Sequence, residues 1–317
     1  MVWLSALLGL AILLLAGDAL VKGAVNLSLR MGIPALIVSL TIVAFGTSAP
    51  ELLISIRAAT EGAPGIALGN VVGSNTANVL AVLGIPALIA VMHTSHCNTR
   101  KSYLQMLGAT ALFIVLAFRG TFDWISGLIL LGALAAMLHS AVRDAMNHRR
   151  NGDAADDDAG DDPEGADPDM PWWKIALFVT LGLIGLPLGA DLLVDSAVTI
   201  ARMFGFSETV IGLTLVALGT SLPELATTVM AAIRRQADVA LGNVIGSNMF
   251  NLLAIIGVAS LIAPMPVDPA FLHFDLWVML GASLLLVPFV FLRRDLTRAW
   301  GVLLSALYVG YIAIVLV

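Results

Sequence analysis

The sequence predicts an all-α polytopic membrane protein with ten transmembrane helices in two inverted five-helix repeats. Hydrophobic residues make up 59% of the 317 residues and charged residues 12%, with a mean hydropathy of +0.96, whereas soluble domains carry about 25% charged residues. Apolar runs also recur between short polar breaks, and a helix needs about 20 such residues to cross a bilayer. The predicted spans are 2–21, 33–57, 65–91, 102–119, 123–142, 172–194, 206–233, 237–262, 271–292 and 297–316.

Two polar blocks inside these apolar runs occur twice. Gly-Thr-Ser-Ala-Pro-Glu-Leu at 46–52 returns as Gly-Thr-Ser-Leu-Pro-Glu-Leu at 219–225, and the block at 69–78, which contains Gly-Ser-Asn, returns at 242–251. Both matches share one offset of 173 residues (219 minus 46). The chain therefore carries a duplicated polar site within its membrane segments, which favours a cation transporter.

Each copy contains five predicted spans, and because five is odd the two copies must lie in opposite orientations. The aligned turns agree, since Glu61-Gly62 in the first copy becomes Arg234-Arg235 in the second. Inverted repeats with binding sites at their interface are a recurrent plan of secondary transporters. The predicted units are a first repeat at 1–143, an acidic cytoplasmic linker at 144–171 and a second repeat at 172–317.

The distribution of basic residues predicts the orientation, because cytoplasmic loops carry an excess of Lys and Arg. With both termini outside, thirteen basic residues lie on the inner side and three on the outer side. The chain is thus expected in the plasma (inner) membrane. The inner set is Lys22, Arg30, Arg100, Lys101, Arg143, Arg149, Arg150, Lys174, Arg234, Arg235, Arg293, Arg294 and Arg298, and the outer set is Arg57, Arg119 and Arg202.

The segment 153–169 between the halves contains nine acidic residues and no hydrophobic periodicity. Such composition is typical of a solvated linker. A regulatory or calcium-collecting loop is the alternative, although the EF-hand pattern is absent. Cys97, with His93 and His96, lies in another loop, and no metal-ligand spacing of Cys and His appears.

The duplicated blocks place oxygen-bearing side chains along helix faces. Ala44, Thr47, Ser48 and Glu51 are spaced i, i+3, i+4, i+7, and the next span carries a stripe at i, i+4, i+8. Calcium takes six to eight oxygen ligands, and sodium is an equally hard cation of similar size. Proline also lacks an N–H, so backbone carbonyls one turn earlier lose their helical hydrogen-bond partner. Ala44 and Ala217 could join the site through such carbonyls. The stripe is Asn70, Ser74 and Asn78, its counterpart is Asn243, Ser247 and Asn251, and the prolines are Pro50 and Pro223.

Glu51 and Glu224 carry the strongest functional signal, because charged groups inside a bilayer are rare and usually functional. No Lys or Arg lies mid-span to neutralise them, so a mobile cation or a proton must do so. Small and hydroxyl residues also let membrane helices pack closely, and this reading fits Thr41, Thr214, Ser74 and Ser247 as well as ligation does. Asp18 and Asp191 lie nearer span ends, where capping or interfacial solvation fits equally well.

In these two blocks the chain resembles the sodium/calcium exchangers of the cation/calcium antiporter superfamily. The resemblance covers most of the chain and implies a rigid core of spans 2–5 and 7–10, across which spans 1 and 6 slide to expose the site to each side in turn. It implies sodium/calcium antiport, with membrane lipid and the two ions as partners and no enzymatic activity, cofactor, nucleic acid or obligatory protein partner. The implied cation ligands are Ala44, Thr47, Ser48, Glu51, Ser74 and Asn78, with Ala217, Thr220, Ser221, Glu224, Ser247 and Asn251 in the second half.

The chain departs from the family pattern at Asn251, where many exchangers carry Asp, and this leaves the ion stoichiometry open. A calcium/proton antiporter is the main alternative, but that group usually has Asn-Ala in place of Thr47-Ser48. A potassium-dependent sodium/calcium exchanger also fits. An intramembrane aspartyl protease, built on Asp18 and Asp191, would leave the duplicated blocks unexplained. A channel fits the near-symmetric site less well than alternating access does.

Overall fold

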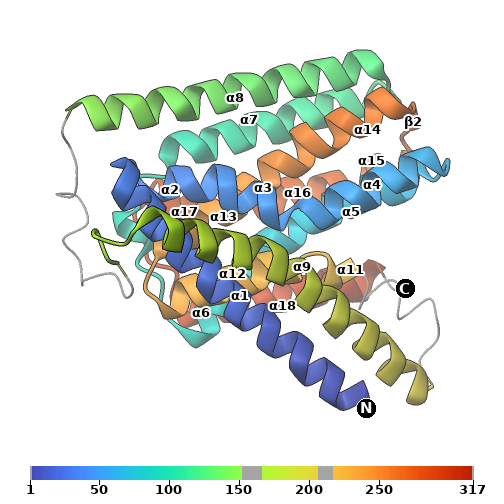
Figure 1. The fold of residues 1–317 in the computed structure, drawn as a ribbon. Helices are drawn as coiled ribbons and strands as arrows, with labels where there is room; N and C mark the ends of the chain where they lie inside the picture. Colours follow the sequence, from blue (N-terminus) through green and yellow to red (C-terminus); the bar gives the residue numbers. More distant parts are fainter. Residues whose placement is uncertain (1, 152–165, 206–216, 316–317) are drawn as a thin grey trace.

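The computed structural model describes residues 2–151, 166–205 and 217–315, and these are mostly helical (Figure 1). The first half consists of α1 (Val2–Met31), α2 (Ala35–Val38), η1 (Ser39–Val43), α3 (Ala44–Thr47), α4 (Ala49–Thr60), α5 (Pro64–Ala77), η2 (Asn78–Val82), α6 (Gly84–Ile89), η3 (Thr94–His96), α7 (Arg100–Ala117), β1 (Thr121–Phe122) and α8 (Trp124–Asn151). The second half consists of α9 (Trp172–Met203), α11 (Ala217–Gly219), α12 (Leu222–Ile233), α13 (Ala237–Phe250), η5 (Asn251–Ile255), α14 (Ile256–Ile262), β2 (Met265–Pro266), α15 (Pro269–His273), α16 (Asp275–Leu284), α17 (Val287–Val290) and α18 (Arg298–Val315).

Seven helices in the described part of the chain are long and apolar enough to cross a membrane, or eight if the bent pair Ala35–Thr47 and Ala49–Thr60 forms one span. The chain is therefore a polytopic membrane protein. The predicted span 102–119 coincides with α7, whose first turn contains Arg100 and Lys101. Part of the predicted span 206–233 lies outside the described residues, which resume with α11.

The two longest helices, α1 and α9, lie side by side along one side of the molecule (Figure 1). They contain 30 and 32 residues, and each extends about ten residues beyond its predicted span. A helix of this length measures about 45 Å, so it must tilt or project beyond a hydrocarbon core of about 30 Å. Polar residues in the extensions are accommodated by aromatic rings of the partner helix, because Lys22 lies 4.9 Å from the ring centre of Phe178.

Glycines bring the backbones of α1 and α9 into close contact. A Cβ added at Gly9 would lie 2.7 Å from the backbone nitrogen of Leu193, and one at Gly182 would lie 2.8 Å from the Cα atom of Leu20. Such close approach is characteristic of membrane helices whose association depends on van der Waals packing. Most of each helix is still exposed, since only 33% of the apolar stretch of α1 and 22% of that of α9 is buried inside the protein.

The centre of the protein is formed by two corresponding spans, one from each half. The span Pro64–Ile89 is 78% buried and the span Ala237–Ile262 is 83% buried. These two spans carry the Gly-Ser-Asn blocks, and the helices with the Gly-Thr-Ser blocks pack against them, as α4 does on α5 and α12 on α13. The duplicated polar residues therefore lie in the best-covered part of the molecule.

The two halves repeat each other in local structure at the offset of 173 residues that separates Asn75 from Asn248. Helices α4, α5 and η2 begin and end at the positions that correspond to the ends of α12, α13 and η5. The six described residues with positive φ form three pairs at the same offset: Gly32 with Gly205, Gly62 with Arg235, and Gly120 with Arg293. Because a side chain is disfavoured at positive φ, the two arginines indicate that the repeated turn geometry persists despite their side chains.

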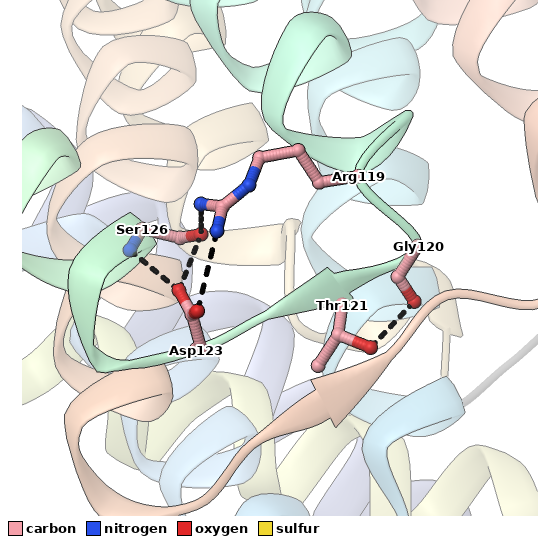
Figure 2. Close-up of polar contacts among 5 residues, drawn as sticks. All are labelled: Arg119, Gly120, Thr121, Asp123 and Ser126. Carbon is pink, nitrogen blue, oxygen red and sulfur yellow. Dashed lines mark hydrogen bonds and ion pairs between the residues drawn. The ribbon is translucent and has the colours of Figure 1, made fainter.

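A polar turn joins α7 to α8 (Figure 2). The carboxylate of Asp123 accepts hydrogen bonds of 2.9 Å from both the backbone N–H and the hydroxyl of Ser126, and Arg119 lies 3.3 Å from its second oxygen. This is the arrangement of a helix N-cap. The Ser126 hydrogen bonds, together with the Arg119 guanidinium, hold the pKa of Asp123 below its usual value. The preceding β1 pairs antiparallel with β2 and so ties the two halves together.

Half of the predicted linker 144–171 lies outside the described residues. Helix α8 continues to Asn151, nine residues past the predicted span end at 142, and α9 begins at Trp172 as expected. The chain between 152 and 165 is not described, so both interpretations of the acidic segment remain predictions.

Candidate functional site

The first duplicated block forms a break between two helices. Ser48 separates α3 from α4 with φ −85° and ψ 7°, and the bent pair of helices changes direction by 47° at this point. Ser221 has nearly the same backbone angles, −86° and 5°, before α12. Each break lies just before a proline in the first turn of the following helix, where a missing N–H costs nothing. The break places the hydroxyl-bearing side chains of Thr47 and Ser48 in the interior of the protein.

Side chains from the two blocks meet across the halves. The Thr47 hydroxyl donates a hydrogen bond of 3.2 Å to the Asn243 side-chain oxygen and lies 3.5 Å from the Ser247 hydroxyl. The Ser48 hydroxyl donates a hydrogen bond of 3.0 Å to Oε1 of Glu224. One buried cluster therefore contains four of the predicted residues, two from each half: Thr47, Ser48, Glu224 and Ser247. The residues that meet are 200 positions apart for Thr47 and Ser247 and 176 for Ser48 and Glu224.

Asn70 and Asn243 support the two glutamate-bearing helices in the same way. The Asn70 amide donates hydrogen bonds to the Glu51 carbonyl at 3.4 Å and to the Ser55 hydroxyl at 3.2 Å. The Asn243 amide donates to the Glu224 carbonyl at 3.3 Å and to the Thr228 hydroxyl at 3.2 Å. The expected site set does not include these asparagines, although their place on the predicted stripe could have revealed them. They fix the backbone from which each carboxylate projects.

A reciprocal contact joins the Gly-Ser-Asn blocks. The Asn75 amide donates to the Asn248 carbonyl at 3.1 Å, and the Asn248 amide lies 3.4 Å from the Asn75 carbonyl. The Asn78 amide also donates to the Asn248 side-chain oxygen at 3.0 Å. In a two-fold arrangement residue i contacts j while j contacts i, and these two residues correspond in the duplicated blocks. Their repetition was the only sequence signal that singled them out.

The helices widen to π-helical turns where the predicted amide ligands lie. The π segments η2 and η5 begin at Asn78 and Asn251 respectively. Single π turns inside α-helices are frequent at functional sites. Because a π turn rearranges the local carbonyl ladder, it changes which backbone oxygens face the interior at these two positions.

Several buried oxygens in this region lack a hydrogen-bond partner among the described residues. They include both carboxylate oxygens of Glu51, Oε2 of Glu224, the Ser221 hydroxyl and the side-chain oxygens of Asn78 and Asn251. Neither glutamate forms an ion pair in the described part of the chain, and their exposed fractions are 1% and 0%. Burying an ionised carboxylate without a partner costs several kcal/mol. The chemistry of this donor set, hard oxygens with up to two negative charges, fits a cation.

Most of the remaining predicted residues whose burial is described are buried. The Ala44 carbonyl accepts hydrogen bonds from the Ser48 backbone N–H at 3.0 Å and from the Thr47 hydroxyl at 3.3 Å, so it keeps a helical partner. Ser74 and Thr220 are buried, 4% and 8% exposed. The backbone of Ala217 forms the start of α11.

Of the residues for which packing or capping was an open alternative, Ser247 belongs to the cluster, whereas Thr41, Asp18 and Asp191 lie away from it. The Thr41 hydroxyl donates to the Ile37 carbonyl of its own helix at 2.7 Å. Asp18 pairs with Arg234, and Asp191 is exposed. Thr214 lies outside the described residues. Among those that are described, no group of three or more His, Cys, Asp and Glu side chains is placed to hold a metal ion, so any cation must rely on neutral oxygens as well.

The family model for sodium/calcium exchanger proteins matches residues 1–141 and 174–317, which is most of the chain. The chain belongs to the sodium/calcium exchanger family. This family is one of exchangers rather than of enzymes. The match excludes only the end of α8, the predicted linker and the start of α9, so both halves with their duplicated blocks are family segments.

Two curated relatives and one solved structure align with almost the whole chain. The sodium/calcium exchanger MaX1 of Methanosarcina acetivorans is 34% identical over 98% of this chain and 97% of its own length. The inner membrane protein YrbG of Escherichia coli is 32% identical over 97% and 94%. The sodium-calcium exchanger NCX_Mj, in a structure soaked with zero Na+ and Ca2+, is 33% identical with a TM-score of 0.82 over 99% of this chain and 100% of that chain. The exchanger fold is therefore shared along the full length.

Proposed function

We propose that this exchanger family member is a secondary active antiporter that exchanges sodium for calcium across the membrane by alternating access. The observation that carries the proposal is the pair of buried glutamates, Glu51 and Glu224, whose carboxylate oxygens largely lack partners among the described residues. A transported cation supplies the missing countercharge. The names of MaX1 and NCX_Mj support sodium and calcium as the ions.

The proposed ligands surround this pair with neutral oxygens. Calcium and sodium are the cargo, and both accept carboxylate, hydroxyl, amide and carbonyl oxygens. The two carboxylates balance one calcium ion or two sodium ions, so either load leaves the site neutral. The proposed set is Ala44, Thr47, Ser48, Glu51, Ser74 and Asn78 from the first half and Ala217, Thr220, Ser221, Glu224, Ser247 and Asn251 from the second.

Ten spans in two inverted repeats are part of the proposal. Support comes from the reciprocal contact between Asn75 and Asn248, which lie 173 positions apart in the two copies. A two-fold axis between the copies would produce such a contact. The three pairs of positive-φ residues at the same offset support the repeat itself. We assign the repeats to 1–143 and 172–317, with 144–171 as the linker.

Alternating access would require α1 and α9 to move relative to the rest. These two helices pack along each other through glycine contacts, and they are much less covered than the central spans. A smooth, glycine-lined pair can move as one body across the core that holds the ligands. The core would keep the ligand geometry while access to it alternates.

The plasma (inner) membrane is the proposed location, with both termini outside the cytoplasm. The excess of basic residues on the loops assigned to the inner side supports this orientation. The name of the inner membrane protein YrbG supports the location. Under this assignment the turn Arg234-Arg235 faces the cytoplasm and the corresponding turn Glu61-Gly62 faces outward.

The test is calcium flux in proteoliposomes with sodium, potassium and proton gradients imposed separately. We expect calcium uptake into sodium-loaded vesicles that requires the outward sodium gradient. The matched control is the double variant Glu51→Gln, Glu224→Gln, which keeps side-chain volume and removes both charges. Uptake that persists at equal sodium and follows the pH gradient would favour the calcium/proton alternative. An added requirement for potassium would favour the potassium-dependent one.

A further inference from the structure

An ion pair joins α1 to the end of α12. The guanidinium of Arg234 donates a hydrogen bond to the carboxylate of Asp18, and the two side chains are 20% and 29% exposed. Arg234 is the C-cap residue of α12, the helix that carries Glu224 in its first turn. The pair therefore connects one of the two long peripheral helices to the helix that presents a proposed ligand.

The backbones of these helices are in contact beside the ion pair. A Cβ added at Gly17 would lie 3.0 Å from the carbonyl oxygen of Ala226 and 3.3 Å from the backbone nitrogen of Thr227. Ala226 is 6% exposed and Thr227 is fully buried. Because the ion pair is held on closely packed helices and is partly shielded from water, it loses less of its attraction to solvent than a surface pair does.

The corresponding positions of the other half cannot form this pair. Asp191 corresponds to Asp18, but Arg234 is replaced by Glu61, which pairs with Arg57 on its own helix. Asp191 has no ion-pair partner among the described residues. The counterpart of the buried Ala226 is Leu53, which is 68% exposed. The peripheral helix is thus closed onto the core at one end of the site, and the matching surface is open at the other.

We propose that the Asp18–Arg234 pair is a latch that stabilises the conformation seen in this structure over the oppositely open one. This inference rests on the proposed alternating access. In the opposite conformation the repeat relation would bring Asp191 toward the Glu61–Arg57 pair. Two acids and one base, with a net negative charge, would then meet in place of one acid and one base. The two conformations therefore differ in electrostatic stability although the site between them is nearly symmetric.

The latch can be tested by distance measurements between spin labels in the full chain, reconstituted in lipid nanodiscs without calcium. In a Cys97→Ser background, Leu15→Cys on α1 and Ile89→Cys on α6 place one label on the moving helix and one on the core, both at exposed positions. We expect Asp18→Asn and Arg234→Gln each to change the ratio of the two distance populations about threefold or more. The charge-reversed double variant Asp18→Lys, Arg234→Glu should return the ratio toward that of the unmodified chain.

Asp191→Asn should shift the ratio in the same direction as Asp18→Asn but by less, because it only removes a charge that lies near Glu61 in the opposite conformation. A second variant, Glu61→Arg, acts on an exposed turn where folding tolerates change, and it offers Asp191 a base. It should shift the populations in the same direction as Asp18→Asn, because it stabilises the opposite conformation. Unchanged ratios in Asp18→Asn, Arg234→Gln and Glu61→Arg would overturn the latch. The readout does not require transport, so a failure of sodium-driven calcium flux would refute the proposed function separately.

Discussion

The two copies of the Gly-Thr-Ser block have the same backbone but different side-chain partners. Ser48 donates a hydrogen bond to Glu224, whereas the equivalent Ser221 donates none to Glu51 in the described part of the chain. As a result, among the described residues, one oxygen of Glu224 has a hydrogen-bond partner while both oxygens of Glu51 lack one. The backbone angles at the two serines differ by only 1° in φ and 2° in ψ.

This difference teaches that local structure follows the sequence motif, whereas side-chain contacts follow the packing of the halves. Helix α1 packs closely on α12, whereas the corresponding surface of α4 is open, as Ala226 and Leu53 illustrate with exposed fractions of 6% and 68%. Of the two equivalent serines, only Ser48 forms a hydrogen bond with the opposite carboxylate in the described part of the chain. The asymmetry belongs to the conformation and not to the chemistry of the blocks.

The largest expected effect would come from removing either carboxylate. Glu51→Gln and Glu224→Gln should each weaken calcium binding at least about a hundredfold, since a unit charge pair 4 Å apart contributes about 4 kcal/mol at an effective dielectric constant of 20. Calcium titration by calorimetry, together with flux, measures the loss. Near-normal flux in either variant would contradict the assignment of both residues to one site.

A smaller effect is expected from the serines, and it separates the two copies. Ser48→Ala should destabilise the ion-free protein by about 1–3 kcal/mol because Glu224 loses a hydrogen-bond donor. Ser221→Ala should change ion-free stability much less, since its hydroxyl has no hydrogen-bond partner among the described residues. Thermal unfolding without and with calcium measures both variants. Equal destabilisation by the two substitutions would show that the ion-free protein does not hold this asymmetric conformation.

Asn251→Asp tests the charge of the second copy. A third carboxylate near two others favours proton binding, because buried like charges disfavour ionisation. We expect sodium-driven calcium flux to become more sensitive to pH between about 6 and 8, with the carboxylates titrating as a group. Asn78→Asp at the equivalent position is the matched variant. Superimposable pH profiles of Asn251→Asp and the unmodified chain would mean that position 251 does not face the ions.

The smallest effect is expected at Thr41. Thr41→Ala should reduce flux only slightly, because the Thr41 hydroxyl is engaged with the Ile37 carbonyl about one turn from the cluster. The measurement is the initial rate of sodium-driven calcium uptake, compared with that of Thr47→Ala, whose hydroxyl contacts Asn243 and lies near Ser247. A loss of flux in Thr41→Ala as large as that in Thr47→Ala would indicate that the ion path reaches η1.

A third sodium ion per calcium would leave the loaded two-carboxylate site positively charged. Moving one elementary charge across the membrane is worth about 2.3 kcal/mol per 100 mV. Flux under an imposed potential therefore measures the stoichiometry, because only two sodium ions per calcium leave the rate independent of voltage.

The sequence by itself predicted the membrane class, the family and the buried glutamates. Long apolar runs have few alternatives in a bilayer, since only structures with internally satisfied backbone groups can cross it. The duplicated blocks are equally informative, because a polar residue retained in such a run indicates a site. The offset of the blocks is also the offset of the repeated helices, but the shared ends of α4 and α12 were not predicted.

Only the tertiary structure decided which of the duplicated side chains meet. The span ends of α1 and α9 were underestimated because helix hydrogen bonds continue past the apolar residues, and Lys22 finds the Phe178 ring of the other helix. The sequence likewise gave no sign that Asp18 pairs with Arg234. Nor did it indicate that Ser48 donates a hydrogen bond to Glu224 while Ser221 donates none to Glu51 in the described part of the chain. These contacts depend on how the two halves are packed against each other, and a near-identical pair of motifs cannot encode that difference locally.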